Sequence, residues 1–70
     1  MSILTAHERR LILERIDRMK ISIADLRSAI DLIFKAEPTT SDAMLLAEAD
    51  IHLGLAAQEL DAAQQRFIRL

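Results

Sequence analysis

The stretch LAEADIHLGLAAQELDAA, residues 46–63, repeats one large and one small apolar residue in fixed phase. Leucine stands at every seventh position, and an alanine follows three residues after each leucine. A seven-residue repeat with two apolar positions is typical of a helix that packs lengthwise against another helix. Extended toward the end of the chain, this seam consists of Leu46, Ala49, Leu53, Ala56, Leu60, Ala63 and Phe67.

A second seam runs through the first half of the chain, with apolar residues spaced alternately four and three apart. Its members are Ile12, Ile16, Met19, Ile23, Leu26, Ile30 and Ile33. Thr5 and Glu8 fit a capping box, in which each side chain accepts a hydrogen bond from the other residue's backbone amide. The first helix is therefore predicted to span about residues 6–36.

Pro38 interrupts the pattern between the two seams, because a proline disfavours helical geometry in the residue before it. Residues 37–41 are predicted to connect the helices, with Thr39, Thr40 or Ser41 as the cap of a second helix at about 41–69. A connection this short makes the helices antiparallel. The predicted fold class is all-α: a single antiparallel helical hairpin of residues 1–70.

The alternation of leucine and alanine lets the facing helix approach closely, because isoleucine side chains fill the space above each alanine. In this respect the chain resembles antiparallel coiled coils with alanine in the seam, a class that includes the Rop-like RNA-binding hairpins of plasmids. The resemblance covers the whole chain and implies the architecture only. It carries over no RNA-contacting residue.

Composition narrows the class of protein. The chain contains one glycine, one proline and no cysteine, and its formal net charge is −2. The lack of cysteine excludes disulfides and thiolate metal sites. No uncharged stretch approaches the roughly 18 residues that span a bilayer, and no signal peptide is visible. We therefore expect a complete small cytoplasmic protein that begins at Met1.

Many apolar residues lie off both seams, so a hairpin alone would leave them exposed. A homodimer that forms a two-fold symmetric four-helix bundle is the expected remedy. The alternative is a partner helix held in a groove made by Ile21, Met44, Ile51 and Leu55. The predicted dimer or partner face consists of Leu13, Ile21, Leu32, Phe34, Met44, Ile51 and Leu55.

Four arginines are expected to meet at the open end of the hairpin, and they form the predicted charged patch: Arg9, Arg10, Arg66 and Arg69. We interpret this patch as a docking site for an acidic protein surface or for phosphates. The alternative is a solvated face with ion pairs at four-residue spacing, from Arg10 to Glu14 and from Glu14 to Arg18.

No pattern predicts a catalytic residue, a cofactor or a metal site. Glu48 and His52 share one helical face, but no further ligands complete a metal site. Gly54 lies within the heptad repeat without a change of phase. We therefore interpret it as a glycine in a helix interior and not as the turn of a helix-turn-helix motif.

These patterns predict a non-enzymatic protein–protein interaction module. We expect a small regulatory adaptor or inhibitor that forms a homodimer and occludes another protein. The layout resembles, in general terms, small adaptors and anti-activators encoded by phages and plasmids. Two alternatives stay open: a secretion-type co-chaperone that holds a partner helix, and a Rop-like RNA-binding hairpin. A membrane or a small-molecule substrate is not expected as a partner.

Overall fold

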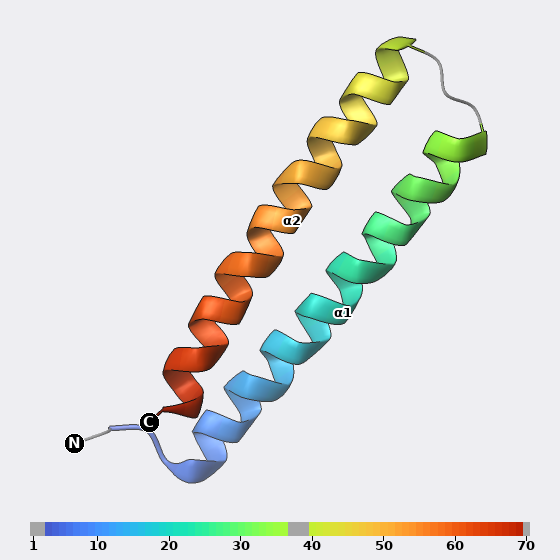
Figure 1. Cartoon of the computed structure of the whole chain (residues 1–70). Coiled ribbons are helices and arrows are strands. Elements are labelled where there is room, and N and C mark those ends of the chain that lie inside the picture. The colour runs from blue at the N-terminus through green and yellow to red at the C-terminus, as the bar shows by residue number, and fades with distance from the viewer. Residues whose placement is uncertain (1–2, 37–39, 70) are drawn as a thin grey trace.

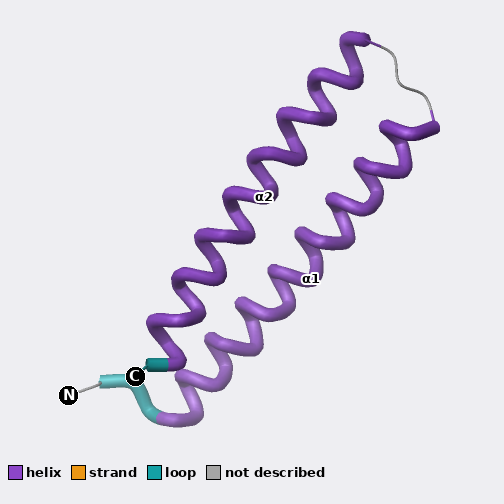
Figure 2. The backbone as a smooth tube through the Cα atoms, viewed as in Figure 1, coloured by secondary structure: helices purple, strands orange, loops and turns teal. Residues whose placement is uncertain are grey.

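Two antiparallel helices make up nearly all of the molecule. The computed structural model describes residues 3–36 and 40–69, and Figure 1 shows the helices side by side with both chain ends at one end of a rod. Helix α1 spans Ala6–Ala36 and helix α2 spans Thr40–Ile68. The described residues contain no strand, and the tube in Figure 2 is helical along both limbs. The predicted all-α helical hairpin is confirmed.

The start of α1 carries the predicted capping box. The Thr5 amide donates to Glu8 Oε1 at 3.0 Å, and the Glu8 amide donates to Thr5 Oγ1 at 3.1 Å. These bonds satisfy two amides that a helix start otherwise leaves free. They also lower the pKa of Glu8, with the Thr5 amide as the larger cause and the Thr5 side chain as the smaller one. Residues 5 and 8 therefore set where α1 begins.

The other helix ends also agree with the sequence pattern. Helix α1 ends at Ala36, close before the proline. Helix α2 ends at Ile68, and the Arg69 amide still donates to the Gln65 carbonyl oxygen at 3.2 Å. The predicted connection spans residues 37–41, but residues 40 and 41 already belong to α2, which begins one residue before its predicted start. Residues 37–39 and the side chains predicted to cap α2 lie outside the described residues.

The rod has little interior. It measures 53 × 15 × 12 Å, and Ile16, which is 8% exposed, is the one buried residue among those described. The accessible surface is 5735 Å². A compact monomer of 7.9 kDa would expose about 4,400 Å². The chain therefore exposes roughly 1,300 Å² more than a compact monomer of its mass.

The α2 seam lies where the repeat predicts it, with one exception. Its partly buried members are Leu46, Ala49, Leu53, Leu60, Ala63 and Phe67. The exception is Ala56, which is exposed while the neighbouring Ala57 is partly buried. The alternation of leucine and alanine thus does face α1.

The α1 seam is rotated relative to the prediction. Its isoleucines at 12, 16, 23 and 30 are partly or fully buried. Met19, Leu26 and Ile33, however, are 54%, 50% and 55% exposed. Lys20 and Arg27, each one residue further along, are partly buried in place of the first two. The prediction that Met19, Leu26 and Ile33 lie within the seam is therefore wrong, because bonds from Lys20 and Arg27 to α2 turn the helix.

Candidate protein-binding surfaces

One long edge of the hairpin is held by polar side chains. Arg27 and Asp50 form a two-point ion pair, with Arg27 Nε donating to Oδ1 at 2.8 Å and Nη2 donating to Oδ2 at 3.2 Å. This geometry orients the guanidinium as well as attracting it. The hydrogen bond from Arg27 is the main reason why the pKa of Asp50 is lowered. The same bond is the main reason why the pKa of Arg27 is raised.

The same edge continues toward the open end of the hairpin through Lys20. Its ammonium group forms an ion pair with Asp61 and donates to Gln64 Oε1 at 3.0 Å. Gln64 Nε2 in turn donates to Asp17 Oδ1 at 2.6 Å. We call this set the ion-pair edge: Asp17, Lys20, Arg27, Asp50, Asp61 and Gln64. Because every one of these contacts joins α1 to α2, the ion-pair edge aligns the two helices along their length.

Gly54 explains how the Arg27 guanidinium fits between the helices. A Cβ atom at residue 54 would lie 3.3 Å from Arg27 Nη1 and 3.4 Å from Arg27 Cζ. The backbone at Gly54 does not have positive φ, so an L-residue could adopt its conformation. The glycine therefore provides room for a neighbouring side chain, not for a turn.

The spacing of the seam residues does not predict the ion-pair edge, but other positions in the sequence indicate it. Lys20 and Arg27 each directly follow a seam residue and are seven residues apart, and Asp50 and Gln64 directly follow seam alanines. Residues that flank a helix–helix seam commonly pair by charge. Matching these positions across an antiparallel hairpin would have identified the edge.

The opposite edge of the hairpin is apolar. Successive residues of an α-helix point about 100° apart, so Met19 and Leu26 flank the contact on the side away from Lys20 and Arg27. In α2, Ala49, Ala56 and Ala63 lie on this same side of the contact between the helices. We call this set the alanine face: Met19, Leu26, Ile33, Ala49, Ala56 and Ala63. Ala49 and Ala63 are partly buried members of the α2 seam, so the alanine face borders the contact between the helices.

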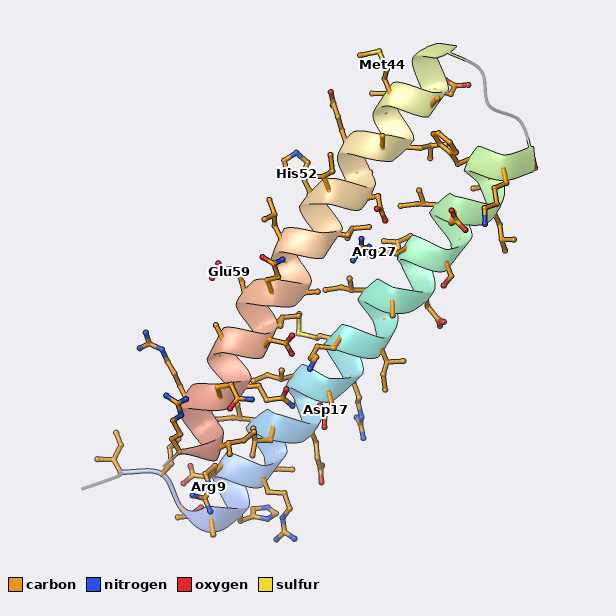
Figure 3. All side chains as sticks on the ribbon, viewed as in Figure 1. Arg9, Asp17, Arg27, Met44, His52 and Glu59 are labelled. Atoms are coloured by element: carbon orange, nitrogen blue, oxygen red, sulfur yellow. The ribbon has the colours of Figure 1, made fainter. Side chains whose placement is uncertain are left out.

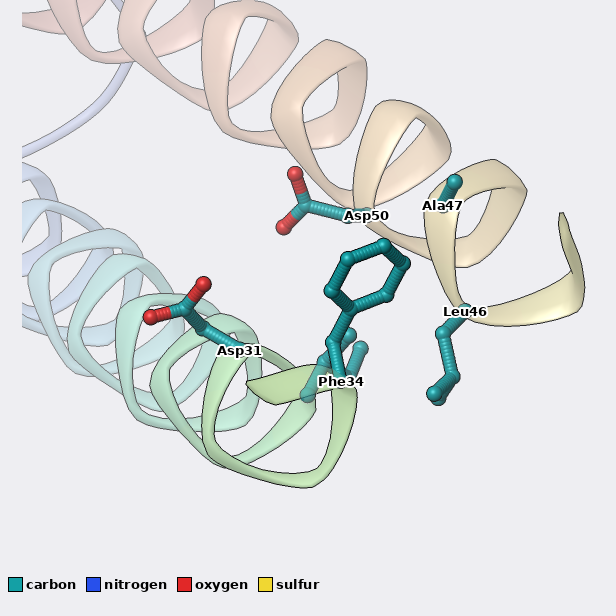
Figure 4. Close-up of a pocket in the computed structure, with 6 residues that line it drawn as sticks. Asp31, Phe34, Leu46, Ala47 and Asp50 are labelled. Atoms are coloured by element: carbon teal, nitrogen blue, oxygen red, sulfur yellow. The ribbon is translucent and has the colours of Figure 1, made fainter. Parts of the chain in front are cut away.

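A pocket of about 230 Å³ opens near the loop end, on the side of the ion-pair edge. It is lined by Ile30, Asp31, Phe34, Leu46, Ala47 and Asp50, and Figure 4 shows the Phe34 ring between the two helices. Both carboxylates of the pocket already have basic partners. Asp50 pairs with Arg27, and Asp31 pairs with Lys35 at 2.9 Å. The pocket therefore offers mainly an aromatic and aliphatic wall.

The structure does not bring the predicted apolar face together. Leu13 is partly buried, and Phe34 belongs to the pocket. Ile21 and Leu32 are exposed on the outer side of α1. The remaining three lie on the outer side of α2, and Figure 3 shows Met44 pointing away from α1. We call these three the outer stripe of α2: Met44, Ile51 and Leu55. Ile21 cannot share a groove with them, because it lies on the other helix and faces away.

The predicted charged patch lies at the open end, where Figure 3 shows Arg9 near the start of α1. Arg9 is partly buried, and the other three arginines of the patch are exposed. Within the described part of the chain, none of the four has an ion pair, and neither Arg10 nor Arg18 pairs with Glu14 as the alternative required. In contrast, Lys20, Arg27 and Lys35 each pair with a carboxylate. Arg15 and Arg18 also have no ion pair among the described residues, so the unpaired positive charge lies in the half of the rod toward the open end.

Other kinds of site find no support in the described ranges. Residues 3–36 and 40–69 contain no group of three or more side chains placed to hold a metal ion, so nothing joins Glu48 and His52. Neither helix, over its described residues, has a segment apolar and long enough to cross a membrane. Comparison with protein-family models, with curated proteins and with solved structures gives no match to this chain.

Proposed function

We propose that this chain is a non-enzymatic protein–protein interaction module, a small regulatory adaptor or inhibitor that binds and occludes another protein in the cytoplasm. The observation that carries the proposal is the imbalance between interior and surface. The described residues include one buried side chain and thirteen exposed large apolar side chains. Binding and catalytic sites for small molecules need an enclosed, water-excluding cavity, whereas a rod acts through the surface that it covers.

The dimensions of the rod suit occlusion. One broad side measures 53 × 15 Å, which is close to the roughly 800 Å² that each partner contributes to a standard protein–protein interface. When a partner binds along this side, the rod completely covers a site of ordinary size on that partner. The chain needs no chemistry of its own to inhibit such a partner.

The charged patch indicates the chemistry of the partner. An arginine without a carboxylate neighbour keeps its five donors available, and these match carboxylates in a two-point geometry. Arg9, Arg10, Arg66 and Arg69 have no such neighbour within the described residues. We infer that the partner presents an acidic surface to the open end of the hairpin.

Affinity capture with a charge-reversed variant tests the proposal. The native chain, a variant with all four patch arginines changed to glutamate, and a matched variant with all four changed to lysine are used as baits in nuclease-treated lysate of the source cells. We expect one protein to bind the native and lysine baits and to be lost from the glutamate bait, which keeps its helical circular dichroism. Equal capture by all three baits would refute the role of the patch.

Capture of RNA from lysate without nuclease treatment, with an affinity that falls steeply as salt is raised, would instead support the RNA-binding alternative. A co-chaperone that holds a partner helix is a second candidate. The outer stripe of α2 favours it, because Met44 and Ile51 are exposed two helical turns apart with Leu55 one turn further on. Under this candidate, Ile51→Asp abolishes capture and Ser28→Asp, on the outer side of α1, does not.

A further inference from the structure

We propose that a second copy of this chain covers the alanine face, and that the two copies lie with their loops at opposite ends of a four-helix bundle. This inference concerns self-association and is independent of the partner proposed above. It starts from area. The chain exposes roughly 1,300 Å² more than a compact monomer of its mass, and obligate homodimers bury at least about 1,000 Å² per subunit. One additional copy is therefore sufficient to cover the excess.

The alanine face has the composition of half a bundle core. Lys20 contacts Gln64 and Arg27 lies beside Gly54, so Met19 is level with Ala63 and Leu26 is level with Ala56. The same register places Ile33 level with Ala49. Each layer thus contains one long and one short apolar side chain, and the layers recur every seven residues.

A second copy matches these layers in spacing and in volume. A two-fold axis level with Ser22 sets the Met19–Ala63 layer of one copy against the Leu26–Ala56 layer of the other, so each of these layers gains another long and another short side chain. Alternating large and small residues fill the centre of a four-helix bundle. Met19 and Leu26, which the hairpin alone leaves half exposed, become part of the shared core of the dimer.

Charge determines the relative direction of the copies. Arg15 lies one turn before Met19, and Arg66 lies one turn after Ala63, so both flank the alanine face at the open end. Copies with their loops at the same end would bring four arginines together, which is unfavourable. Turning one copy end for end separates the two arginine pairs, and each Arg15 then lies level with Ala29 of the other copy, which carries no charge.

The end-for-end arrangement has a consequence for Ser22. A two-fold axis perpendicular to the rod sets α1 beside the α1 of the second copy, and residues near the middle of α1 meet their own equivalents. Ser22 is near that midpoint and on the side of the alanine face, because it follows Met19 by three residues and precedes Leu26 by four. Ser28 is also exposed but lies on the outer side of α1.

Sedimentation equilibrium of the full chain is the first test. We expect twice the chain mass of 7.9 kDa for the native protein and for Ile21→Asp, which alters an exposed outer residue. Leu26→Asp places a charge in the shared core and should raise the dimer dissociation constant by more than roughly a hundredfold. A folded native monomer would overturn the proposal. So would a Leu26→Asp dimer of native affinity, or a dimer that Ile21→Asp disrupts.

Disulfide cross-linking is the second test, and it holds even if Leu26→Asp simply fails to fold. The native chain has no cysteine, so each single-cysteine variant reports one position. We expect Ser22→Cys to give a covalent dimer at least tenfold faster than Ser28→Cys under the same oxidant. Equal rates at the two positions would overturn the assignment of the face. Absence of any link in a chain that sediments as a dimer would overturn the end-for-end arrangement.

Discussion

Replacing Gly54 by alanine should stabilise the protein. Alanine is favoured over glycine in a helix interior by about 1 kcal/mol, because glycine loses more backbone freedom on folding. Against this gain stands one close contact, since the new Cβ would lie 3.3 Å from Arg27 Nη1. The contacting atoms are the far end of a flexible side chain, which needs to move only a few tenths of an ångström. We therefore expect a net gain of about 0.5 to 1 kcal/mol in the free energy of unfolding.

Urea unfolding followed by circular dichroism measures this gain. The native and variant proteins must be compared at one protein concentration, because association stabilises the folded state by mass action. The corresponding rise in Tm is about 2 to 8 °C for a chain of this length. A second pair of proteins, with Arg27→Met in both, removes the contact with the guanidinium and should show the full propensity gain.

The two backgrounds together decide whether the reasoning is right. We expect Gly54→Ala to raise the free energy of unfolding less when Arg27 is present than in the Arg27→Met background. The difference between the two values is the cost of displacing the guanidinium. If Gly54→Ala instead destabilises the protein in both backgrounds, the glycine is needed for something other than room for Arg27. A close approach by another backbone at this position would then be the better explanation.

Further predictions concern acid sensitivity and packing. The pKa values of Glu8 and Asp50 are lowered in the folded state, so their stabilisation is complete above the ordinary carboxyl pKa and is lost as pH falls through the folded values. Glu8→Gln and Asp50→Asn should each reduce the fall in the free energy of unfolding at low pH, measured by urea unfolding across a range of pH. A variant with the same pH profile as the native protein would show that the replaced carboxylate does not cause this fall. Ile16→Ala should cost about 2 to 3 kcal/mol because Ile16 is 8% exposed, whereas Ile21→Ala should cost less than about 1 kcal/mol because Ile21 is 65% exposed. Similar losses at the two positions would refute the packing described for α1.

Local patterns in the sequence were sufficient for the helices. Thr5 and Glu8 act within one turn, and the proline acts on the residue before it, so neither depends on the other helix. The α2 seam could also be predicted, because leucine and alanine recur there in a fixed seven-residue phase. These features explain why the hairpin and its bounds agree with the prediction.

The rotation of α1 could not be predicted from apolar spacing. Met19 and Lys20 are neighbours, and the hydrophobic pattern favours Met19, but the carboxylate of Asp61 and the amide of Gln64 favour Lys20. The same competition decides between Leu26 and Arg27, where Asp50 is the partner. The outcome depends on residues more than twenty positions away in the chain, and a periodicity argument does not weigh them.

The sequence predicts where the charged patch lies, but it does not predict which apolar residues share a surface. That Arg9, Arg10, Arg66 and Arg69 lie toward the same end of the rod follows from an antiparallel hairpin and their positions in the sequence. Which apolar residues share a side does not follow, because the answer depends on the angle at which α1 faces α2. Phe34 therefore lines a pocket beside the ion-pair edge, although it was grouped with residues of the outer surface.

The position of the chain ends determines how this protein can be fused to other proteins. The start of α1 and the end of α2 lie toward the same end of the rod (Figure 1), so a cargo fused to either terminus is attached toward that end of a rod 53 Å long. In the proposed dimer the two attachment points lie at opposite extremities. The pair of copies would then serve as a stiff spacer that holds two fused cargoes about one rod length apart, whichever terminus carries them.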